Sequence, residues 1–112
     1  MANEAIISKT YELVKYATPI LNKIPRNYKF TFSDRVINLL ADLLEHIIEA
    51  YYAPRNTKKA LLQKVNIKIE IIRHFFRLGY EWGLYNSIQY KHFSTRLDEI
   101  GRMTGGWIKS LR

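Results

Sequence analysis

Apolar residues recur along this chain at intervals of three and four, which is the period of an amphipathic helix. No stretch shows the sustained alternation of a β-strand, so the predicted fold class is all-α. Breaker and capping residues divide the pattern into four helical segments of similar length. Because connections of roughly three to six residues favour antiparallel neighbours, an up-down-up-down four-helix bundle is the simplest topology. We expect residues 1–112 to form a single domain.

The first two predicted helices each carry one apolar stripe. The first helix is expected from about Asn3 to Ile24, stopped by Pro25 and kinked in its last turn by Pro19. Its stripe is Ile6, Leu13, Ala17, Ile20 and Ile24. The second helix opens at 31–34, where TFSD resembles a capping box with Asp in place of Glu, and ends before Pro54. Its stripe is Val36, Leu40, Leu43, Ile47 and Tyr51.

The last two predicted helices have clear capping signals. Thr57 is expected to cap the third helix, which runs to about Gly83 in the position just past the helix end. Asn86 with Gln89 is expected to cap the fourth helix, which runs from Ser87 toward Leu111.

The third helix differs from the others because it has two apolar stripes about 120° apart. One stripe is Leu62, Val65, Ile69, Ile72 and Phe76. The other, the candidate oligomer interface, is Ile67, Ile71, Phe75, Leu78 and Trp82. A bundle helix needs one apolar face, so the second stripe predicts self-association; the alternative is that this helix is the most enclosed one of a monomer. The remaining arc is polar and carries Lys59, Asn66, Glu70, Arg73 and Arg77.

The charge of the chain favours polyanionic partners. Eighteen basic residues against ten acidic ones give a formal net charge of +8, and seven of the basic residues lie between Arg55 and Arg77 with Glu70 as the one acid. There is no cysteine, so burial alone must stabilise the fold, which suits a reducing cytosol. The start of the chain lacks the basic residues of a signal peptide, and acids interrupt its most apolar region. We therefore expect a soluble, cytoplasmic protein without a membrane partner.

No set of residues points to catalysis. His46, His74 and His92 fall on three different predicted helices, and none has the spacing of a carboxylate-histidine metal bundle. The chain has no phosphate-binding glycine loop, nucleophile elbow or cysteine nucleophile. We therefore expect no catalytic residues, no metal site and no cofactor.

The segment 23–35, KIPRNYKFTFSDR, alternates cations with aromatic rings. Its cations are Lys23, Arg26, Lys29 and Arg35, and its rings are Tyr28, Phe30 and Phe32. Cations for phosphate and rings for base stacking are what single-stranded nucleic-acid binding requires. The alternative is that the two phenylalanines plug the end of the bundle, which leaves Tyr28 as the ring expected to be exposed.

Three glycines interrupt the fourth helix, at Gly101, Gly105 and Gly106. Each costs about 1 kcal/mol relative to alanine, so something must compensate. We expect close approach of the backbone to a neighbouring helix, with Trp107 as an apolar anchor. The alternative is a flexible hinge for a partner.

Three segments together resemble a known family: 23–36 (KIPRNYKFTFSDRV), 43–53 (LLEHIIEAYYA) and 97–111 (LDEIGRMTGGWIKSL). The chain resembles the accessory variability determinant proteins of diversity-generating retroelements, which belong with the four-helix-bundle proteins encoded in 23S rRNA intervening sequences. The likeness covers essentially the whole chain, and EIGRMTGGWIKS is its most distinctive block.

The resemblance implies a homopentameric barrel of four-helix bundles that binds a reverse transcriptase and its template RNA or cDNA during mutagenic retrohoming, without catalysis of its own. The basic residues carried over from matching segments are Lys23, Arg26, Lys29 and Arg35, and the polar arc of the third helix adds Lys59, Arg73 and Arg77. One alternative is an intervening-sequence-type interaction bundle without a retroelement role. Another is a structural bundle whose positive surface meets an acidic protein.

Overall fold

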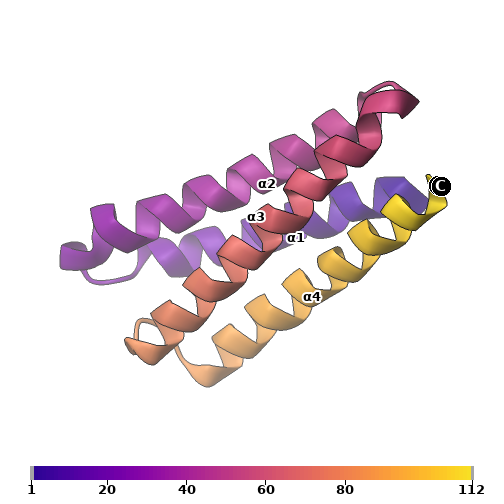
Figure 1. Ribbon diagram of the computed structural model, residues 1–112. Coiled ribbons are helices and arrows are strands. Elements are labelled where there is room, and N and C mark those ends of the chain that lie inside the picture. Colours follow the sequence, from indigo (N-terminus) through magenta and orange to yellow (C-terminus); the bar gives the residue numbers. More distant parts are fainter. Residues whose placement is uncertain (1, 112) are drawn as a thin grey trace.

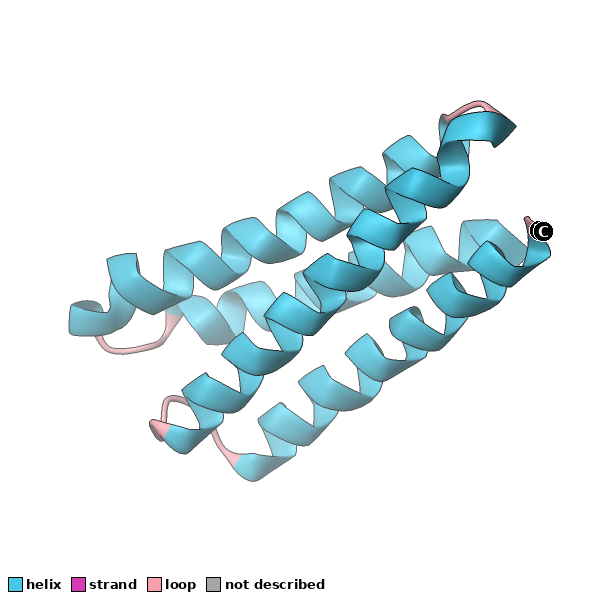
Figure 2. Cartoon of the chain, viewed as in Figure 1, coloured by secondary structure: helices cyan, strands magenta, loops and turns pink. Residues whose placement is uncertain are grey.

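The computed structural model describes residues 2–111; Met1 and Arg112, the two ends of the expected 1–112 domain, lie outside the described residues. The chain forms four α-helices: α1 (Ala2–Asn22), α2 (Asp34–Tyr52), α3 (Arg55–Glu81) and α4 (Ser87–Ser110) (Figure 1). No strand occurs among residues 2–111, so the predicted all-α class is confirmed (Figure 2). In the same range, no helix combines the length and the apolar run that crossing a membrane requires.

The helices surround one hydrophobic core. Each helix packs against the next along the chain, and α1 also packs against α4, in a body of 44 × 24 × 19 Å (Figure 1). The largest fully buried side chains come from all four helices and from the connection between α1 and α2. They include Phe32, Phe76 and Phe93.

The predicted stripes of α1 and α2 are largely buried, and each differs from its prediction at one position. In α1, Leu21 is fully buried, whereas Ile20 is half-buried. In α2, Ala50 is fully buried, whereas Tyr51 is half-buried because its hydroxyl donates a hydrogen bond to Glu4 at the surface (2.8 Å). The periodicity thus located both buried faces, but at one position of each helix a residue adjacent to the predicted one is buried instead.

The connection between α1 and α2 contradicts the predicted capping box. Residues Arg26–Tyr28 form a 3₁₀ turn, and Lys29–Ser33 form a π-helical turn that continues directly into α2. Ser33 has helical dihedral angles (φ −58°, ψ −54°), and its side chain makes no capping hydrogen bond. Asp34 instead forms an ion pair with Lys29 (Nζ to Oδ1, 3.0 Å). Because the backbone is already helical before Asp34, α2 does not begin with the free N–H groups that a capping box would satisfy.

The predicted cap of α3 is also wrong, although the predicted end of this helix is confirmed. Pro54 occupies the N-cap position, and Thr57 lies inside the first turn, where its hydroxyl donates to the Pro54 carbonyl (3.0 Å). At the other end, Gly83 has φ +73°, a conformation that glycine adopts without strain. The N–H groups of Gly83 and Leu84 donate to the carbonyls of Tyr80 and Gly79 (both 2.9 Å), which completes a Schellman motif.

The predicted capping box of α4 is confirmed. The side chain of Asn86 accepts a hydrogen bond from the backbone N–H of Gln89 (2.8 Å), and the Gln89 side chain accepts one from the backbone N–H of Asn86 (3.0 Å). This reciprocal pair satisfies two N–H groups that have no partner inside the helix, and it fixes where α4 starts.

The glycines of α4 do not lie where the backbone approaches a neighbouring helix. A Cβ atom added at Gly105 or Gly106 would meet no atom of the described chain within 4 Å, and at Gly101 it would make only ordinary contacts at 3.8 Å. The close approach predicted for this segment is therefore wrong within one chain, although Trp107 is buried as expected.

A close approach occurs instead at Gly79 in α3. A Cβ atom at Gly79 would lie 2.5 Å from both the Phe32 ring and the Tyr85 hydroxyl. Both side chains are buried, and the Tyr85 hydroxyl also donates to the carbonyl of Phe76. Gly79 therefore allows Phe32 and Tyr85 to close this end of the bundle.

We predict that Gly79→Ala destabilises the fold by about 1–2 kcal/mol, because overpacking costs about 1–3 kcal/mol and the gain in helix propensity returns at most about 1 kcal/mol. Gly106→Ala is the matched control: it sits in a helix with open space around it and should raise stability by about 0.5–1 kcal/mol. Thermal and urea unfolding, followed by circular dichroism, measure both changes. A Gly79→Ala variant as stable as Gly106→Ala would contradict the packing described for this end.

Candidate functional site

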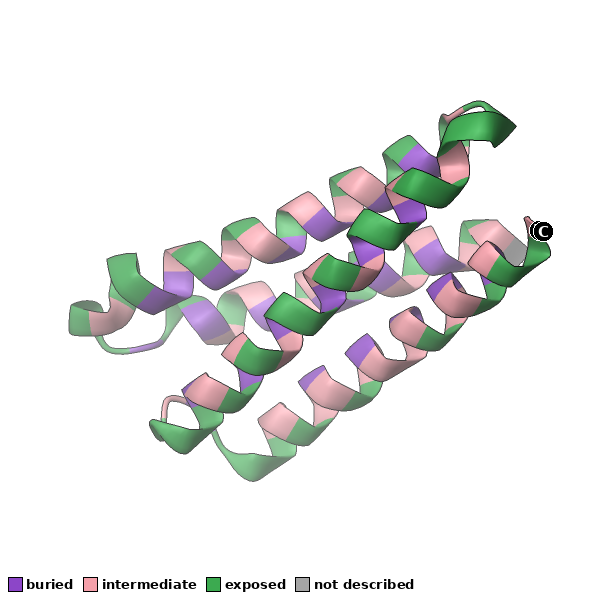
Figure 3. Ribbon diagram, viewed as in Figure 1, coloured by how far each residue is buried: buried purple, intermediate pink, exposed green. Residues whose placement is uncertain are grey.

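The two apolar stripes of α3 have different environments. The stripe from Leu62 to Phe76 is buried in the core, with exposed fractions of 2% or less. The second stripe, hereafter the α3 outer stripe (Ile67, Ile71, Phe75, Leu78 and Trp82), is only partly covered: Ile67, Ile71 and Trp82 are exposed, whereas Phe75 and Leu78 are half-buried against the core. Ile67 is 62% and Trp82 50% exposed, and exposed positions recur along α3 in Figure 3. A single chain therefore does not enclose the α3 outer stripe.

Aromatic side chains extend the α3 outer stripe toward the α1–α2 connection. Trp82 packs against the rings of Tyr28 and Phe32, with centroid separations of 5.7 and 6.1 Å. The guanidinium of Arg35 lies 5.5 Å from the centre of the Phe75 ring, within the range of a cation–π contact. Apolar surface and a cation are therefore adjacent at this end of α3.

The three rings of the connection have separate environments. Phe32 is fully buried, as expected of a plug at the bundle end. Phe30 is 79% exposed, so it does not contribute to the plug. Tyr28 is half-buried against Trp82, so the prediction that Tyr28 is the exposed ring is wrong. The sequence pattern could not distinguish these rings because the irregular turns set the direction of each one.

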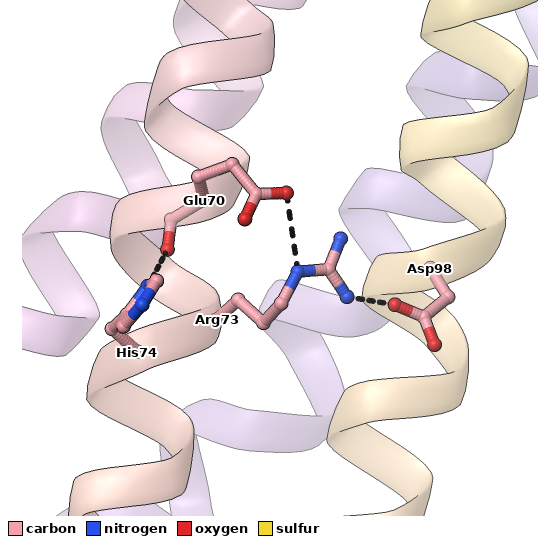
Figure 4. A network of polar contacts seen from close by, with 4 residues as sticks. All are labelled: Glu70, Arg73, His74 and Asp98. Atoms are coloured by element: carbon pink, nitrogen blue, oxygen red, sulfur yellow. Dashed lines mark hydrogen bonds and ion pairs between the residues drawn. The ribbon is translucent and has the colours of Figure 1, made fainter.

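Three of the predicted phosphate-binding cations are ion-paired within the chain. Lys29 pairs with Asp34, and Arg77 pairs with Glu81 on the same helix (2.8 Å). Arg73 bridges two helices, since it contacts Glu70 on α3 (3.2 Å) and Asp98 on α4 (Figure 4).

Figure 4 also shows His74, whose Nδ1 lies 2.8 Å from the Glu70 carbonyl oxygen.

Partial burial lowers the pKa of Arg73, but the hydrogen bond and charge of Asp98, together with Glu70, outweigh this effect and raise the pKa. The hydrogen bond from Arg77 to Glu81 likewise raises the pKa of Arg77. Both arginines therefore remain charged, with part of their charge already balanced.

The other predicted cations have no carboxylate partner in the described chain. Lys23, Arg26, Arg35 and Lys59 are all exposed, and none forms an ion pair within residues 2–111. Their charges are not balanced by an adjacent acid. They come from the α1–α2 connection, the first turn of α2 and the first turns of α3.

Lys58 has a structural role that the sequence did not reveal. Its ammonium group donates hydrogen bonds to the carbonyls of Ala50 (2.9 Å) and Tyr51 (2.6 Å), at the end of α2. The Ala50 carbonyl otherwise accepts only the long hydrogen bond from the N–H of Ala53 (3.4 Å), and the Tyr51 carbonyl lies in the last turn, where no N–H of the helix follows to bond it. A positive charge at a helix C-terminus is also favourable. One of the basic residues between Arg55 and Arg77 is thus used to end a helix.

A pocket lies between the end of α1 and the turns that precede α2. Its lining residues are Leu21, Asn22, Ile24, Arg26, Lys29, Phe30 and Ser33. Sequence reasoning identified the cations and the exposed ring but missed Asn22 and Ser33. Neither residue has a spacing or composition that would separate it from an ordinary surface or capping residue.

The histidines do not come together. His92 stacks on Tyr16 with ring centroids 3.8 Å apart, and burial together with the charge of Arg96 lowers the pKa of His92. Among residues 2–111, no cluster of three or more His, Cys, Asp or Glu side chains could hold a metal ion.

Comparison with known proteins gives a match to a protein family. A family model described as bAvd-like matches residues 5–111, which cover nearly the whole chain. A comparison with curated proteins finds no significant match. The family match confirms the resemblance to accessory variability determinant proteins.

Proposed function

Because the chain belongs to the bAvd-like family, we propose that it is a non-catalytic accessory protein of a diversity-generating retroelement. In this role it binds the reverse transcriptase of the element and its template RNA or cDNA, and so supports mutagenic retrohoming. The polymerase chemistry belongs to the reverse transcriptase. The protein acts in the cytoplasm as a single-domain, antiparallel up-down-up-down bundle that assembles into a homopentameric barrel.

The observation that carries the proposal is the partly exposed α3 outer stripe, with Ile67, Ile71 and Trp82 in water, in a protein of net charge +8. A contiguous row of large apolar side chains on a helix is unfavourable in water and marks a surface that binds another protein. A large positive charge marks affinity for a polyanion. One surface therefore serves assembly, and cations elsewhere serve nucleic-acid binding.

A ring of five subunits imposes a condition on the interface. In a closed ring with an odd number of subunits, each contact joins two different surfaces, because a two-fold contact pairs subunits instead. We propose that the α3 outer stripe of one subunit supplies one of these surfaces. Its nearly continuous apolar character suits the buried centre of such a contact.

The cations without carboxylate partners are the proposed phosphate contacts. Lys23, Arg26, Arg35 and Lys59 release counterions when they bind phosphate, without first having to leave an ion pair. Lys29, Arg73 and Arg77 contribute less, because an anion must compete with Asp34, Asp98 or Glu81 for them. The protein therefore binds nucleic acid mainly through a subset of its cations.

Ile67→Lys tests the assembly surface, and Ile88→Lys is its matched control. Ile88 is a 77% exposed isoleucine on α4, outside the α3 outer stripe, so both variants place the same charge at an exposed helical isoleucine. We expect Ile67→Lys to weaken self-association by at least about tenfold, because it places an unpaired charge in an apolar contact. Light scattering and sedimentation should show a mass several times that of the chain for wild type and Ile88→Lys. A monomeric wild type, or equal masses for the two variants, would contradict the assembly.

The double variant Lys23→Ala/Lys59→Ala tests the phosphate contacts. Its control is the double variant Lys9→Ala/Lys68→Ala, which removes the same charge from two lysines that pair with Glu99 and Asp42. We expect wild-type affinity for single-stranded RNA or DNA to fall steeply with salt. The Lys23/Lys59 variant should bind about tenfold more weakly, with a shallower salt dependence, because phosphate contacts set that slope. Fluorescence anisotropy across a series of salt concentrations measures both quantities. Equal losses in the two double variants would show that only total charge matters.

The partner is tested by co-expression with the reverse transcriptase of a diversity-generating retroelement. We expect the two proteins to co-purify, and light scattering of the complex gives the number of subunits. If the protein binds nucleic acid but never co-purifies with the polymerase, the accessory role in a retroelement is wrong and an independent nucleic-acid-binding bundle remains.

A further inference from the structure

The pocket beside the α1–α2 connection has the size of a small-ligand site. Its volume is about 430 Å³, within the range of about 300–1,000 Å³ that is common for such sites. Leu21 and Ile24, which also belong to the buried core, line the pocket and form its apolar wall. The 3₁₀ and π-helical turns supply the opposite side, including Arg26, Lys29 and Phe30.

Ser33 is the unusual residue of this pocket. It is 3% exposed, and its hydroxyl has no hydrogen-bond partner in the described chain. The two buried threonines behave differently: Thr10 and Thr104 each donate to the carbonyl four residues earlier (both 2.8 Å). For Ser33 that carbonyl belongs to Lys29, and the Ser33 hydroxyl does not donate to it; in the π-helical turn this carbonyl accepts the N–H of Asp34.

A buried hydroxyl without a partner loses its hydrogen bonds to water, at a cost of about 1–3 kcal/mol. Such groups are rare in folded proteins and call for an explanation. The Ser33 hydroxyl oxygen is itself buried, but Ser33 lines the pocket, and its side chain can turn about a single bond so that the hydroxyl donates to a ligand atom there.

The pocket lining contains two cationic side chains and one amide. Arg26 supplies a guanidinium, Lys29 an ammonium group and Asn22 an amide that can donate or accept, and Arg26 forms no ion pair among residues 2–111. The C-terminal end of α1 contributes a partial negative charge of about half a unit, which the charge of Arg26 exceeds, whereas the charge of Lys29 is balanced by Asp34. Two cations beside a hydroxyl match the oxygens of a phosphate group.

The rim of the pocket carries the exposed ring of Phe30. A phenylalanine that is 79% exposed gains little from the fold, and the Lys29 ammonium lies 5.6 Å from the centre of its ring. Base stacking on an exposed ring stabilises single-stranded complexes by about 1–3 kcal/mol per base. An apolar wall, a set of donors and a free ring match the sugar, phosphate and base of one nucleotide.

We propose that this pocket binds one nucleotide: its phosphate group contacts Arg26, Lys29 and Ser33, and its base stacks on Phe30. The inference rests on the proposed function and identifies where the nucleic acid is held. The phosphate is either a strand terminus or part of the backbone, since both present the same oxygens. The Asp34 carboxylate competes with the phosphate for Lys29, so Asp34 sets the affinity of the pocket for anions.

Inorganic phosphate tests the pocket without any oligonucleotide. In ¹⁵N-NMR titrations of the full chain, we expect shifts of the Arg26, Lys29 and Ser33 amides. Ser33→Ala should weaken phosphate binding by about tenfold, because it removes a hydrogen bond to a charged group. It should leave the melting temperature equal or higher, since the hydroxyl has no internal partner. A lower melting temperature together with unchanged phosphate binding would overturn the assignment of Ser33.

Charge-matched variants separate the pocket from general electrostatics. Arg26→Ala should weaken phosphate binding far more than Arg55→Ala, which removes another exposed arginine at the start of α3. Asp34→Asn should strengthen phosphate binding, whereas Asp42→Asn, which removes another α2 carboxylate and frees Lys68 on α3, should change it little. Equal effects within both pairs would show that phosphate responds only to net charge and would overturn the pocket.

The ring is tested with a short oligothymidylate, compared with and without a 5′-phosphate. Phe30→Leu should weaken oligothymidylate binding by about tenfold and leave inorganic phosphate binding unchanged. Tyr52→Leu, which removes a ring of the same exposure (78%) at the end of α2, should affect neither. Preference for the 5′-phosphorylated strand identifies a strand terminus as the ligand, and equal affinity identifies the backbone.

Different results would contradict the nucleotide pocket and the proposed function. If the chain binds the oligonucleotide and the Ser33, Arg26 and Phe30 variants behave like their controls, the pocket is wrong and the proposed function stands. If the chain binds inorganic phosphate in the pocket but no nucleic acid, the nucleic-acid part of the proposed function is wrong.

Discussion

The structure depends on how α3 divides its apolar surface. One stripe of this helix is fully enclosed by the rest of the bundle, and it contains Val65, Ile72 and Phe76. The α3 outer stripe lies on another side of the same helix, and the described residues leave Ile67 mostly exposed. A helix has only one face that can turn toward its own core, so the second stripe must either lie in water or bind another molecule.

The closed end of the bundle positions the parts proposed to be functional. Gly79 leaves space for the Phe32 ring and for Tyr85, whose buried hydroxyl bonds to the Phe76 carbonyl. Burial of Phe32 holds the turns around it, and these turns direct Phe30 outward and place Ser33 beside the pocket. The plug, the exposed ring and the pocket are thus consequences of one packing arrangement.

Ion pairing separates cations that look alike in the sequence. Arg73 and Arg26 are both arginines in basic segments, yet Arg73 joins α3 to α4 through Asp98, whereas Arg26 forms no ion pair in the part of the chain that the structure describes. Lys58 ends α2, while the adjacent Lys59 faces solvent. Residues with free charge attract phosphate more strongly than residues whose charge is already balanced within the fold.

The sequence by itself determined the fold class, the approximate bounds of four helices, most of the buried stripes of the first three and the capping box at Asn86, because hydrophobic period and local capping act between residues close together in the chain. It also determined the family. Only the tertiary structure decided that Gly79 rather than Gly105 marks a close approach, that Phe30 rather than Tyr28 is exposed, and that Ser33 lacks a partner. These outcomes depend on contacts between residues far apart in the chain and on irregular turns, and no local pattern encodes either.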